Sequence, residues 1–362
     1  MAAKKAVVGM SGGVDSSVAA YLLKKQGYDV TGVTMLLWTE ENEGKTGINA
    51  ACGSGQAAKD AKKVADILQI PHYTVDFSSV FKEKVVDYFA EEYLHARTPN
   101  PCIACNRHVK WEALLAYALE SGADYIATGH YARIKRLENG RLAVCSSATE
   151  KKDQTYALYR LTQEQLAHTL MPVGEYTKPQ IRKLAEEALL PVASKGDSQE
   201  ICFIPDNDYA SFIKRYTGVV MPDGDFVTPD GKVLGRHKGL CNYTIGQRRG
   251  LGLPMGHRVF VKALDTVRNE VVIAENEDMY TDVVRMNSLC FMGVEDLASG
   301  MPERFTGKIR YGHAGTPCMA HRTGEDEVTC YFDEPVRAAT PGQSMVLYRD
   351  NYVAMGGIIS DS

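Results

Sequence analysis

Val7-Val8-Gly9-Met10 runs directly into Ser11-Gly12-Gly13-Val14-Asp15-Ser16-Ser17, and Val18-Ala19-Ala20-Tyr21-Leu22-Leu23 follows at once. An apolar run, a glycine turn and a helical pattern in this order predict a strand, a loop and a helix. Gly12 and Gly13 let the backbone approach a phosphate, the serine hydroxyls add hydrogen-bond donors, and the amide groups at the helix start carry partial positive charge. The stretch therefore predicts a phosphate-binding loop.

Two common nucleotide motifs are excluded by the spacing of this loop. It lacks the Gly-Lys-Ser/Thr of a P-loop and the three-glycine spacing of a dinucleotide fingerprint. A glycine-rich turn without any ligand stays open as the alternative for the isolated motif.

Around this loop, the first third of the chain alternates strand-like and helix-like patterns. The expected strands are 5–10, 29–38, 72–77 and 124–128, and the expected helices are 15–26, 56–68, 80–95 and 109–120. Such alternation is typical of an α/β fold with a doubly wound parallel sheet. Ligands in such sheets bind at the carboxyl ends of the strands.

The remainder of the chain changes texture twice. From 153 to about 218 the pattern is helical, with Thr177-Lys178-Pro179 opening a helix through Leu190. After Asp223, short strands are expected at 226–227, 232–234, 258–264 and 270–274, and then at 305–311, 317–321, 328–332, 344–349 and 352–359. The predicted domains are residues 1–210, a small central β domain at 211–280, and a C-terminal β-barrel at 281–362.

Composition places the chain among ordinary globular proteins. It has 362 residues, 44% hydrophobic and 24% charged, with no apolar run long enough for a membrane span and no signal peptide. A cytoplasmic protein with no membrane association is expected, with its nine cysteines mainly reduced. The formal charge is −4, yet Gly231–Lys262 holds seven Lys or Arg and no acid, so a polyanion would be met locally.

Three cysteines lie in polar segments. Cys102 and Cys105 belong to the Pro-punctuated stretch Thr98–Asn106, which predicts a rigid loop that displays its cysteines. A single Cys-x-x-Cys is compatible with half a zinc site, a redox pair or chance. Cys202 follows Lys195-Gly196-Asp197-Ser198-Gln199-Glu200-Ile201, and taken alone it would be a buried cysteine.

Ser11–Ser16 resembles the pyrophosphatase loop of N-type ATP pyrophosphatases, which transfer AMP to a carbonyl oxygen. Together with the cysteine segments, the chain strongly resembles the tRNA-specific 2-thiouridylase family. The matching segments are 11–17, 98–106, 127–131, 152–154, 197–203, 244–252, 340–344 and 356–359. The resemblance implies an adenine nucleotide alpha-hydrolase-like sheet domain, a small central β domain and a C-terminal β-barrel.

The resemblance also implies roles for individual residues. Cys105 matches the nucleophile and Cys202 the persulfide carrier, which would form a disulfide with each other during turnover. Asp15 would help to hold Mg²⁺ on the pyrophosphate. The implied ATP contacts are Gly9, Met10, Ser11, Gly12, Gly13, Val14, Asp15, Ser16, Met35 and Gly129.

Implied tRNA contacts come from several segments. They are Asn100, Pro101, Cys102, His130, Lys152, Asp153, Gln154, Arg310, Tyr311 and Gln343, with His130 and Tyr311 expected near an extruded uridine. Arg236, Lys238, Arg248, Arg249 and Arg258 offer further phosphate contacts. Cys102 departs from the family pattern, because many members have Asp there, so no carboxylate role is carried over.

The activity implied is ATP-dependent 2-thiolation of the wobble uridine (U34) of tRNA for Lys, Glu and Gln. It would proceed through an adenylated uridine and a protein persulfide, loaded by a cysteine desulfurase or a sulfur-relay protein. A [4Fe-4S] cluster on Cys102, Cys105 and Cys202 is the less favoured sulfur route. Another adenylating synthetase with the same ATP loop, and a non-catalytic nucleotide-binding module, are the other interpretations.

Overall fold

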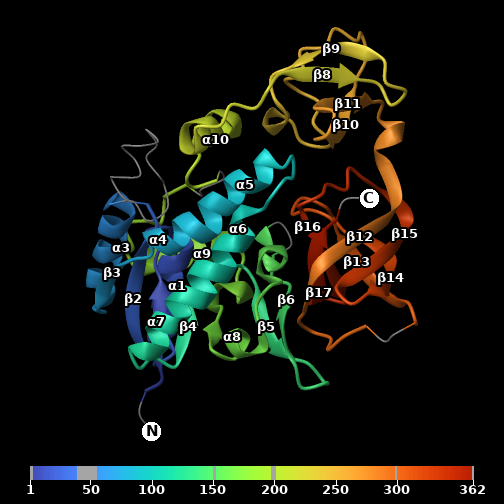
Figure 1. Cartoon of the computed structure of the whole chain (residues 1–362). Coiled ribbons are helices and arrows are strands. Elements are labelled where there is room, and N and C mark those ends of the chain that lie inside the picture. Colours follow the sequence, from blue (N-terminus) through green and yellow to red (C-terminus); the bar gives the residue numbers. More distant parts are fainter. Residues whose placement is uncertain (1–2, 39–54, 150–151, 197–200, 298–299, 361–362) are drawn as a thin grey trace.

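The computed structural model describes residues 3–38, 55–149, 152–196, 201–297 and 300–360. A sheet flanked by helices forms the N-terminal part, a small sheet lies at the far end of helix α10, and a strand-rich body completes the chain (Figure 1). None of the described helices combines the length and the apolar character needed to cross a membrane. The expected order of an α/β part and two β parts is confirmed.

The N-terminal sheet is parallel throughout, in the order β3-β2-β1-β4-β7. Its strands are β1 (Lys5–Gly9), β2 (Asp29–Leu36), β3 (His72–Asp76), β4 (Tyr125–Ala127) and β7 (Thr169–Leu170). Alternate residues of β1 serve opposite cores: Val7 joins the one with Phe81 and Trp111, and Val8 joins the one with Val18. The predicted doubly wound sheet is therefore confirmed.

Helices cover both faces of this sheet. They are α1 (Val14–Lys25), α3 (Gly55–Leu68), α4 (Ser78–Phe81), α5 (Tyr88–Leu94), α6 (Pro101–Ala104), α7 (Leu115–Glu120), α8 (Gln163–Ala167) and α9 (Lys178–Glu187). Helix α10 (Tyr209–Thr217) instead packs against α5, where Phe212 contacts Phe89. The π-helical segments Lys82–Asp87 and Cys105–Leu114 join α4 to α5 and α6 to α7. Short 3-10 turns lie at Thr155–Leu158 and Pro172–Glu175.

The loop expected over Thr98–Asn106 is wrong in its second half, and so is the helix start expected at 109. The helix begins at Pro101, eight residues earlier, so that Cys102 and Cys105 stand in its first turns. Asn100 caps it, since its Oδ1 accepts from the amides of Cys102 (3.1 Å) and Ile103 (3.3 Å). An Asn-Pro pair in this arrangement is a helix-start signal.

The central domain is a four-stranded sheet in the order β10-β11-β8-β9. Its strands are β8 (Gly224–Val227), β9 (Val233–His237), β10 (Phe260–Asp265) and β11 (Glu270–Ala274). Phe226, Val261 and Val271 are buried in its own small core, so this part packs largely on itself.

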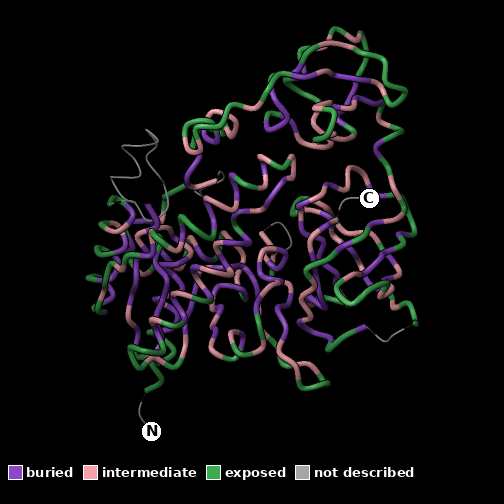
Figure 2. Tube along the Cα trace, in the orientation of Figure 1, coloured by how far each residue is buried: buried purple, intermediate pink, exposed green. Residues whose placement is uncertain are grey.

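Six antiparallel strands form the C-terminal barrel, because β12 pairs with both β15 and β17 and so closes the sheet. They are β12 (Tyr280–Phe291), β13 (Glu303–Lys308), β14 (Thr316–Gly324), β15 (Glu327–Arg337), β16 (Ser344–Arg349) and β17 (Tyr352–Ile359). The barrel was expected, but β12 was not. Figure 2 shows that many residues of the barrel strands and of the N-terminal sheet are buried (purple).

A hairpin of β5 (Arg133–Arg136) and β6 (Leu142–Cys145), also unpredicted, connects the first domain to the barrel. Cys145 of β6 pairs with Tyr352 of β17, which extends the barrel sheet. Arg141 strengthens the junction by donating to the carbonyls of Phe291 (3.0 Å) and Met292 (2.7 Å). The hairpin, which lies in sequence between strands β4 and β7 of the parallel sheet, therefore belongs to the barrel sheet and links the two domains.

Candidate active site

The glycine loop lies between β1 and α1, at the carboxyl end of the central strand. Gly12 has φ of +68°, and a Cβ there would lie 2.5 Å from the carbonyl oxygen of Ala57. A Cβ on Gly129 would lie 2.6 Å from the amide nitrogen of Ser16. Both positions require glycine, because any side chain would collide with backbone.

The start of α1 is arranged to receive an anion. Gly13 is its N-cap, and no described side chain accepts from the amides of the first turn. Ser16 and Ser17 instead direct their hydroxyls to the Gly13 carbonyl (3.3 and 2.8 Å), and the Ser11 amide donates to Ser16 Oγ (3.2 Å). Free amides at a helix start are suited to an anion, so this arrangement is compatible with the predicted phosphate-binding loop.

Asp15 forms part of a polar cluster that the sequence reasoning missed. Lys178 Nζ lies 2.8 Å from both Asp15 carboxylate oxygens, and the Tyr131 hydroxyl donates to Oδ1 (2.7 Å). The Lys178 side chain is only 12% exposed. The Thr-Lys-Pro helix start was visible in the sequence, but nothing there indicated that its lysine reaches the loop 163 residues earlier.

A second lysine reaches the other side of the loop. Lys195 Nζ donates to the Gly12 carbonyl (3.0 Å) and to Asp60 Oδ2 (2.8 Å). The bond from Lys195 holds the pKa of the Asp60 carboxyl below its usual value. Lys195 therefore links α3 and the loop to the segment that continues toward Cys202.

The residues predicted for the adenosine side lie beside the same loop. A Cβ on Gly9 would lie 3.3 Å from Leu114 Cδ2 and 3.8 Å from Met35 Cε. Met35 and Met10 are both buried, and the Thr34 hydroxyl donates to the Met10 carbonyl (2.9 Å). The structure therefore brings Gly9 and Met35 together, and it places Gly129 against Asp15 and Ser16.

The three singled-out cysteines differ in exposure. Cys102 is exposed, whereas Cys105 and Cys202 are partly buried and pack against the same hydrophobic core. Phe203 anchors the Cys202 segment, because its fully buried ring packs edge-on against Phe81 and Phe89. Residues 197–200 of this motif lie outside the described ranges.

No group of three His, Cys, Asp or Glu side chains suited to holding a metal ion occurs among the described residues. For Mg²⁺, the loop offers the Asp15 carboxylate and serine hydroxyls, which are the hard oxygen ligands that this ion prefers. The loop residues therefore fit a Mg²⁺ ion carried in with phosphates, in competition with Lys178 for Asp15.

His130 lies deeper than a base-stacking residue would. Its ring packs 5.4 Å from that of Trp111, and Thr128 Oγ1 lies 2.7 Å from its Nδ1. Burial, with the Lys110 charge adding to it, holds the pKa of His130 well below its usual value. Tyr311, the other stacking candidate, is 52% exposed.

The predicted tRNA contacts around Asp153 take part in a network of hydrogen bonds within the protein. The Asp153 carboxylate accepts from the amides of Ser147 (3.0 Å) and Thr155 (3.1 Å), and the Tyr311 hydroxyl donates to its carbonyl (3.2 Å). Gln154 Oε1 accepts from the Tyr131 amide (2.8 Å). Gln154 therefore contacts the tyrosine that donates to Asp15, and Lys152 and Asp153 directly precede Gln154 in the chain.

Two barrel residues reach the same region. Gln343 Nε2 donates to the Thr98 carbonyl (3.2 Å), just before the cysteine helix, where Pro101 is buried. Arg310 donates to the Arg337 carbonyl (2.7 Å). Burial, with smaller contributions from nearby groups that include Asp153 and Cys102, raises the pKa of its neighbour Tyr311. Cys102, Tyr311 and Gln343 are therefore gathered where the barrel meets the helix.

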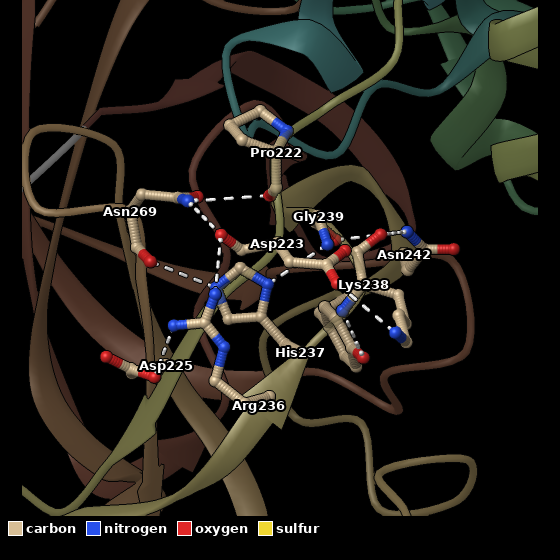
Figure 3. A network of polar contacts seen from close by, with 10 residues as sticks. Pro222, Asp223, Asp225, Arg236, His237, Lys238, Gly239, Asn242 and Asn269 are labelled. Carbon is tan, nitrogen blue, oxygen red and sulfur yellow. Dashed lines mark hydrogen bonds and ion pairs between the residues drawn. The ribbon is translucent and has the colours of Figure 1, made fainter.

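The basic stretch of the central domain divides into two kinds of residue. Arg236 pairs with Asp225 (2.9 Å) and Lys238 with Asp223 (3.2 Å), so the acids come from just upstream of the acid-free stretch (Figure 3). Arg248, Arg249 and Arg258 are exposed, and none forms an ion pair with any residue that the structure describes. Of the five predicted phosphate contacts, these three are therefore the ones whose charge no described acid neutralises.

The parallel sheet, the uncapped glycine loop and the Asp15 cluster define a nucleotide-binding domain of the ATP pyrophosphatase type. Family models agree along the chain: a tRNA methyl transferase HUP domain matches residues 4–206, a tRNA methyl transferase PRC-barrel domain 210–275, and an aminomethyltransferase beta-barrel domain 285–359.

Relatives match nearly end to end. A tRNA-specific 2-thiouridylase of Lachnoclostridium phytofermentans is 55% identical over 98% of this chain and 99% of its own length. Those of Clostridium acetobutylicum and Clostridioides difficile are 51% and 49% identical, over 98% and 99% of this chain and 99% of each relative. The chain belongs to the tRNA-specific 2-thiouridylase family.

Proposed function

We propose that this protein is a tRNA-uridine 2-sulfurtransferase that replaces the C2 oxygen of the wobble uridine with sulfur at the expense of ATP. One observation carries the proposal: a single domain contains both a glycine loop whose following helix has no side-chain cap and two cysteines, Cys105 and Cys202, that pack against the same hydrophobic core. Family membership over nearly the whole chain supports the same activity.

The loop explains the first half of the reaction. Uridine C2 is a weak electrophile, so its oxygen attacks the α-phosphorus of ATP, and the bond to the β-phosphate breaks to release pyrophosphate. The amides of the α1 start and Lys178 are placed to stabilise charge on the departing pyrophosphate. Mg²⁺, when bound at Asp15, would supply further charge neutralisation there.

The cysteines explain the second half. A sulfur-donor protein loads Cys202 as a persulfide, and the Cys105 thiolate attacks the Cys202 sulfur, giving a Cys105–Cys202 disulfide and releasing hydrosulfide. Hydrosulfide adds to the activated C2 and expels AMP, which leaves the thiocarbonyl. A reductant returns both cysteines to thiols. The donor is proposed to be a cysteine desulfurase or a sulfur-relay protein.

We place the tRNA across all three domains, with boundaries near residues 210 and 280. Arg248, Arg249 and Arg258 meet phosphates, while Asn100, Cys102, Lys152, Tyr311 and Gln343 surround the anticodon. For His130 to contact the base, its packing against Trp111 would first have to open. The expected substrates are the tRNAs for Lys, Glu and Gln.

The cluster route remains the second candidate because Cys102 replaces the usual acid. Cys102 is exposed, whereas Cys105 and Cys202 are partly buried. This difference separates Cys102 from the other two cysteines and favours the persulfide route, which needs only Cys105 and Cys202. Nucleoside analysis of tRNA from cells lacking this protein tests the activity: wobble 2-thiouridine should disappear and return on complementation. Unchanged thiouridine levels would contradict it.

A further inference from the structure

A cavity of about 400 Å³ lies where the N-terminal helices meet the barrel. Lys84, Arg107 and Arg160 line it, together with the Glu83 carboxylate. Lys84 pairs with Glu83 (2.7 Å) and Arg107 with Glu112 (3.3 Å), so Arg160 is the lining cation without a described ion-pair partner. The polar groups that matter here come from five segments: Tyr88, Asn100 with Arg107, Arg160, Ser288 and Ser344. Nothing assigned to the ATP loop is among its lining residues.

Several donors in this cavity lack partners among the described residues. Arg160 uses Nε on the Tyr159 hydroxyl (2.9 Å) and Nη2 on the Ser288 carbonyl (3.1 Å), while its Nη1 bonds to no described residue. Arg107 uses only Nε, on Glu112 (3.3 Å). Both guanidinium groups are oriented by hydrogen bonds through Nε and still have Nη atoms available, which is an arrangement suited to binding a phosphate.

Tyr88 and Asn100 add neutral groups suited to a base edge. The Tyr88 hydroxyl makes no hydrogen bond within the described residues. Its oxygen is also not one of the fully buried polar atoms that lack a partner there, so the hydroxyl is accessible to solvent. Burial raises the pKa of Tyr88 to about 12, which keeps the hydroxyl protonated. Asn100 caps the helix with Oδ1, which leaves its amide nitrogen for a ligand.

The cavity shares a wall with the reactive segment. Asn100, Ile103, Ala104 and Arg107 line it at helical spacing, whereas Cys102 and Cys105 do not line it. The two faces of one helix are about 10–12 Å apart. Gly342 and Ser344 also line the cavity, on either side of Gln343. If the target uridine is bound at Cys102 and the anticodon loop is unstacked, a nucleotide next to that uridine would therefore reach this cavity.

We propose that this junction cavity binds an anticodon-loop nucleotide adjoining the target uridine, with its phosphate on Arg107 and Arg160 and its base edge on Tyr88 and Asn100. The inference rests on the proposed function and adds to it a site for selecting the tRNA. A free mononucleotide has the same chemistry, so the experiment separates the two sources.

The test measures the affinity of the full chain for an anticodon stem-loop, intact or with one abasic neighbour of the target. Arg107→Gln should weaken the intact RNA about 5- to 20-fold, and Tyr88→Phe about 3- to 10-fold. An abasic RNA at the bound position should abolish the Tyr88→Phe effect and keep the Arg107→Gln effect. Arg304→Gln, an exposed arginine of the barrel, is the matched control.

Two outcomes would overturn the proposal. If both variants bind the intact RNA within twofold of wild type, the cavity proposal fails. A second outcome is that wild-type protein binds free UMP or CMP and Arg107→Gln abolishes this binding, while the variant binds the RNA as tightly as wild type does. The cavity would then be a site for a free nucleotide, and the proposal would be overturned. Wild-type thiolation of full tRNA, assayed in parallel, separates this failure from failure of the proposed function.

Discussion

At the scale of single residues, Gly12 shows how backbone conformation limits the ATP loop. Gly12→Ala would place a Cβ 2.5 Å from the Ala57 carbonyl at a positive φ, so we expect the loop to distort and pyrophosphate release to fall at least 100-fold. Gly27→Ala is the control, because Gly27 also has positive φ but meets no atom within 4 Å. Loss of activity in the control as well would remove the loop-specific explanation.

The two cysteines allow an ordered prediction. Cys202→Ser should block persulfide loading, whereas Cys105→Ser should load normally and fail to transfer sulfur to tRNA. Loading is measured by alkylation and peptide mass analysis after incubation with a persulfide donor. Cys318→Ser is a suitable control, since Cys318 is buried in the barrel core away from both segments. A persulfide on Cys105 in the Cys202→Ser protein would reverse the roles.

At the scale of elements, the turn after β9 depends on one buried histidine. His237 Nε2 lies 3.0 Å from the Asn269 carbonyl, and the Gly239 amide donates to Nδ1 (3.1 Å), which fits a neutral ring protonated on Nε2 (Figure 3). Burial lowers the pKa of His237 below its usual 6.5. Protonation would therefore cost this turn a hydrogen bond.

The sign of the pH effect follows from this lowered pKa. The unfolded chain takes up the proton first, so the contribution of His237 is complete above about pH 6.5 and is lost as the pH falls below that value. His237→Leu should lower the stability of the central domain by about 1–3 kcal/mol at pH 7.5 and reduce the loss between pH 6.5 and 5. Denaturant unfolding measures both, with exposed His257→Gln as control. An unchanged pH slope would contradict the assignment.

The elements also show what the sequence could and could not reveal. Strands β1 to β4 and helix α1 were predictable, because apolar periodicity and glycine punctuation are local signals. The helix start at Pro101 was missed although Asn100 and Pro101 signal it, because closely spaced prolines are equally typical of a loop. Hairpin β5–β6 was missed although Asn139-Gly140, between its two strands, is a local turn signal. Strand β12 pairs with residues from 42 (Met286 with Val328) to 73 (Met286 with Ile359) positions later in the chain, which no local pattern shows.

The candidate site divides along the same line. The glycine loop and the cysteine segments are contiguous motifs, so sequence reasoning found them. Lys178 and Lys195 reach the loop from 163 and 183 residues away, and their roles depend on how α9 and the following turns pack. Likewise, the pairing of Arg236 and Lys238 with upstream acids became evident only from the β8–β9 register.

At the scale of the whole molecule, the central domain carries an exposed basic face that is separate from the ATP loop. Charge reversal of Arg248 and Arg249 should weaken tRNA binding and lower the salt slope by roughly 0.7 to 0.9 for each phosphate that is no longer neutralised. ATP affinity should remain unchanged. Arg268→Glu is the control within the same domain, because Arg268 lies 3.9 Å from Asp265. Binding measured across a salt series with an unaltered slope would exclude this face from the tRNA interface.

The central claim is that one chain couples ATP cleavage to sulfur transfer through two cysteines. The most direct measurement is a reconstitution with purified iron-free protein, ATP, Mg²⁺, a persulfide donor, a reductant and unmodified tRNA. Nucleoside analysis should show wobble 2-thiouridine formed with one AMP and one pyrophosphate each, and none with Cys105→Ser or Cys202→Ser. Pyrophosphate release without thiouridine, or thiouridine that appears only after cluster reconstitution, would contradict the persulfide mechanism.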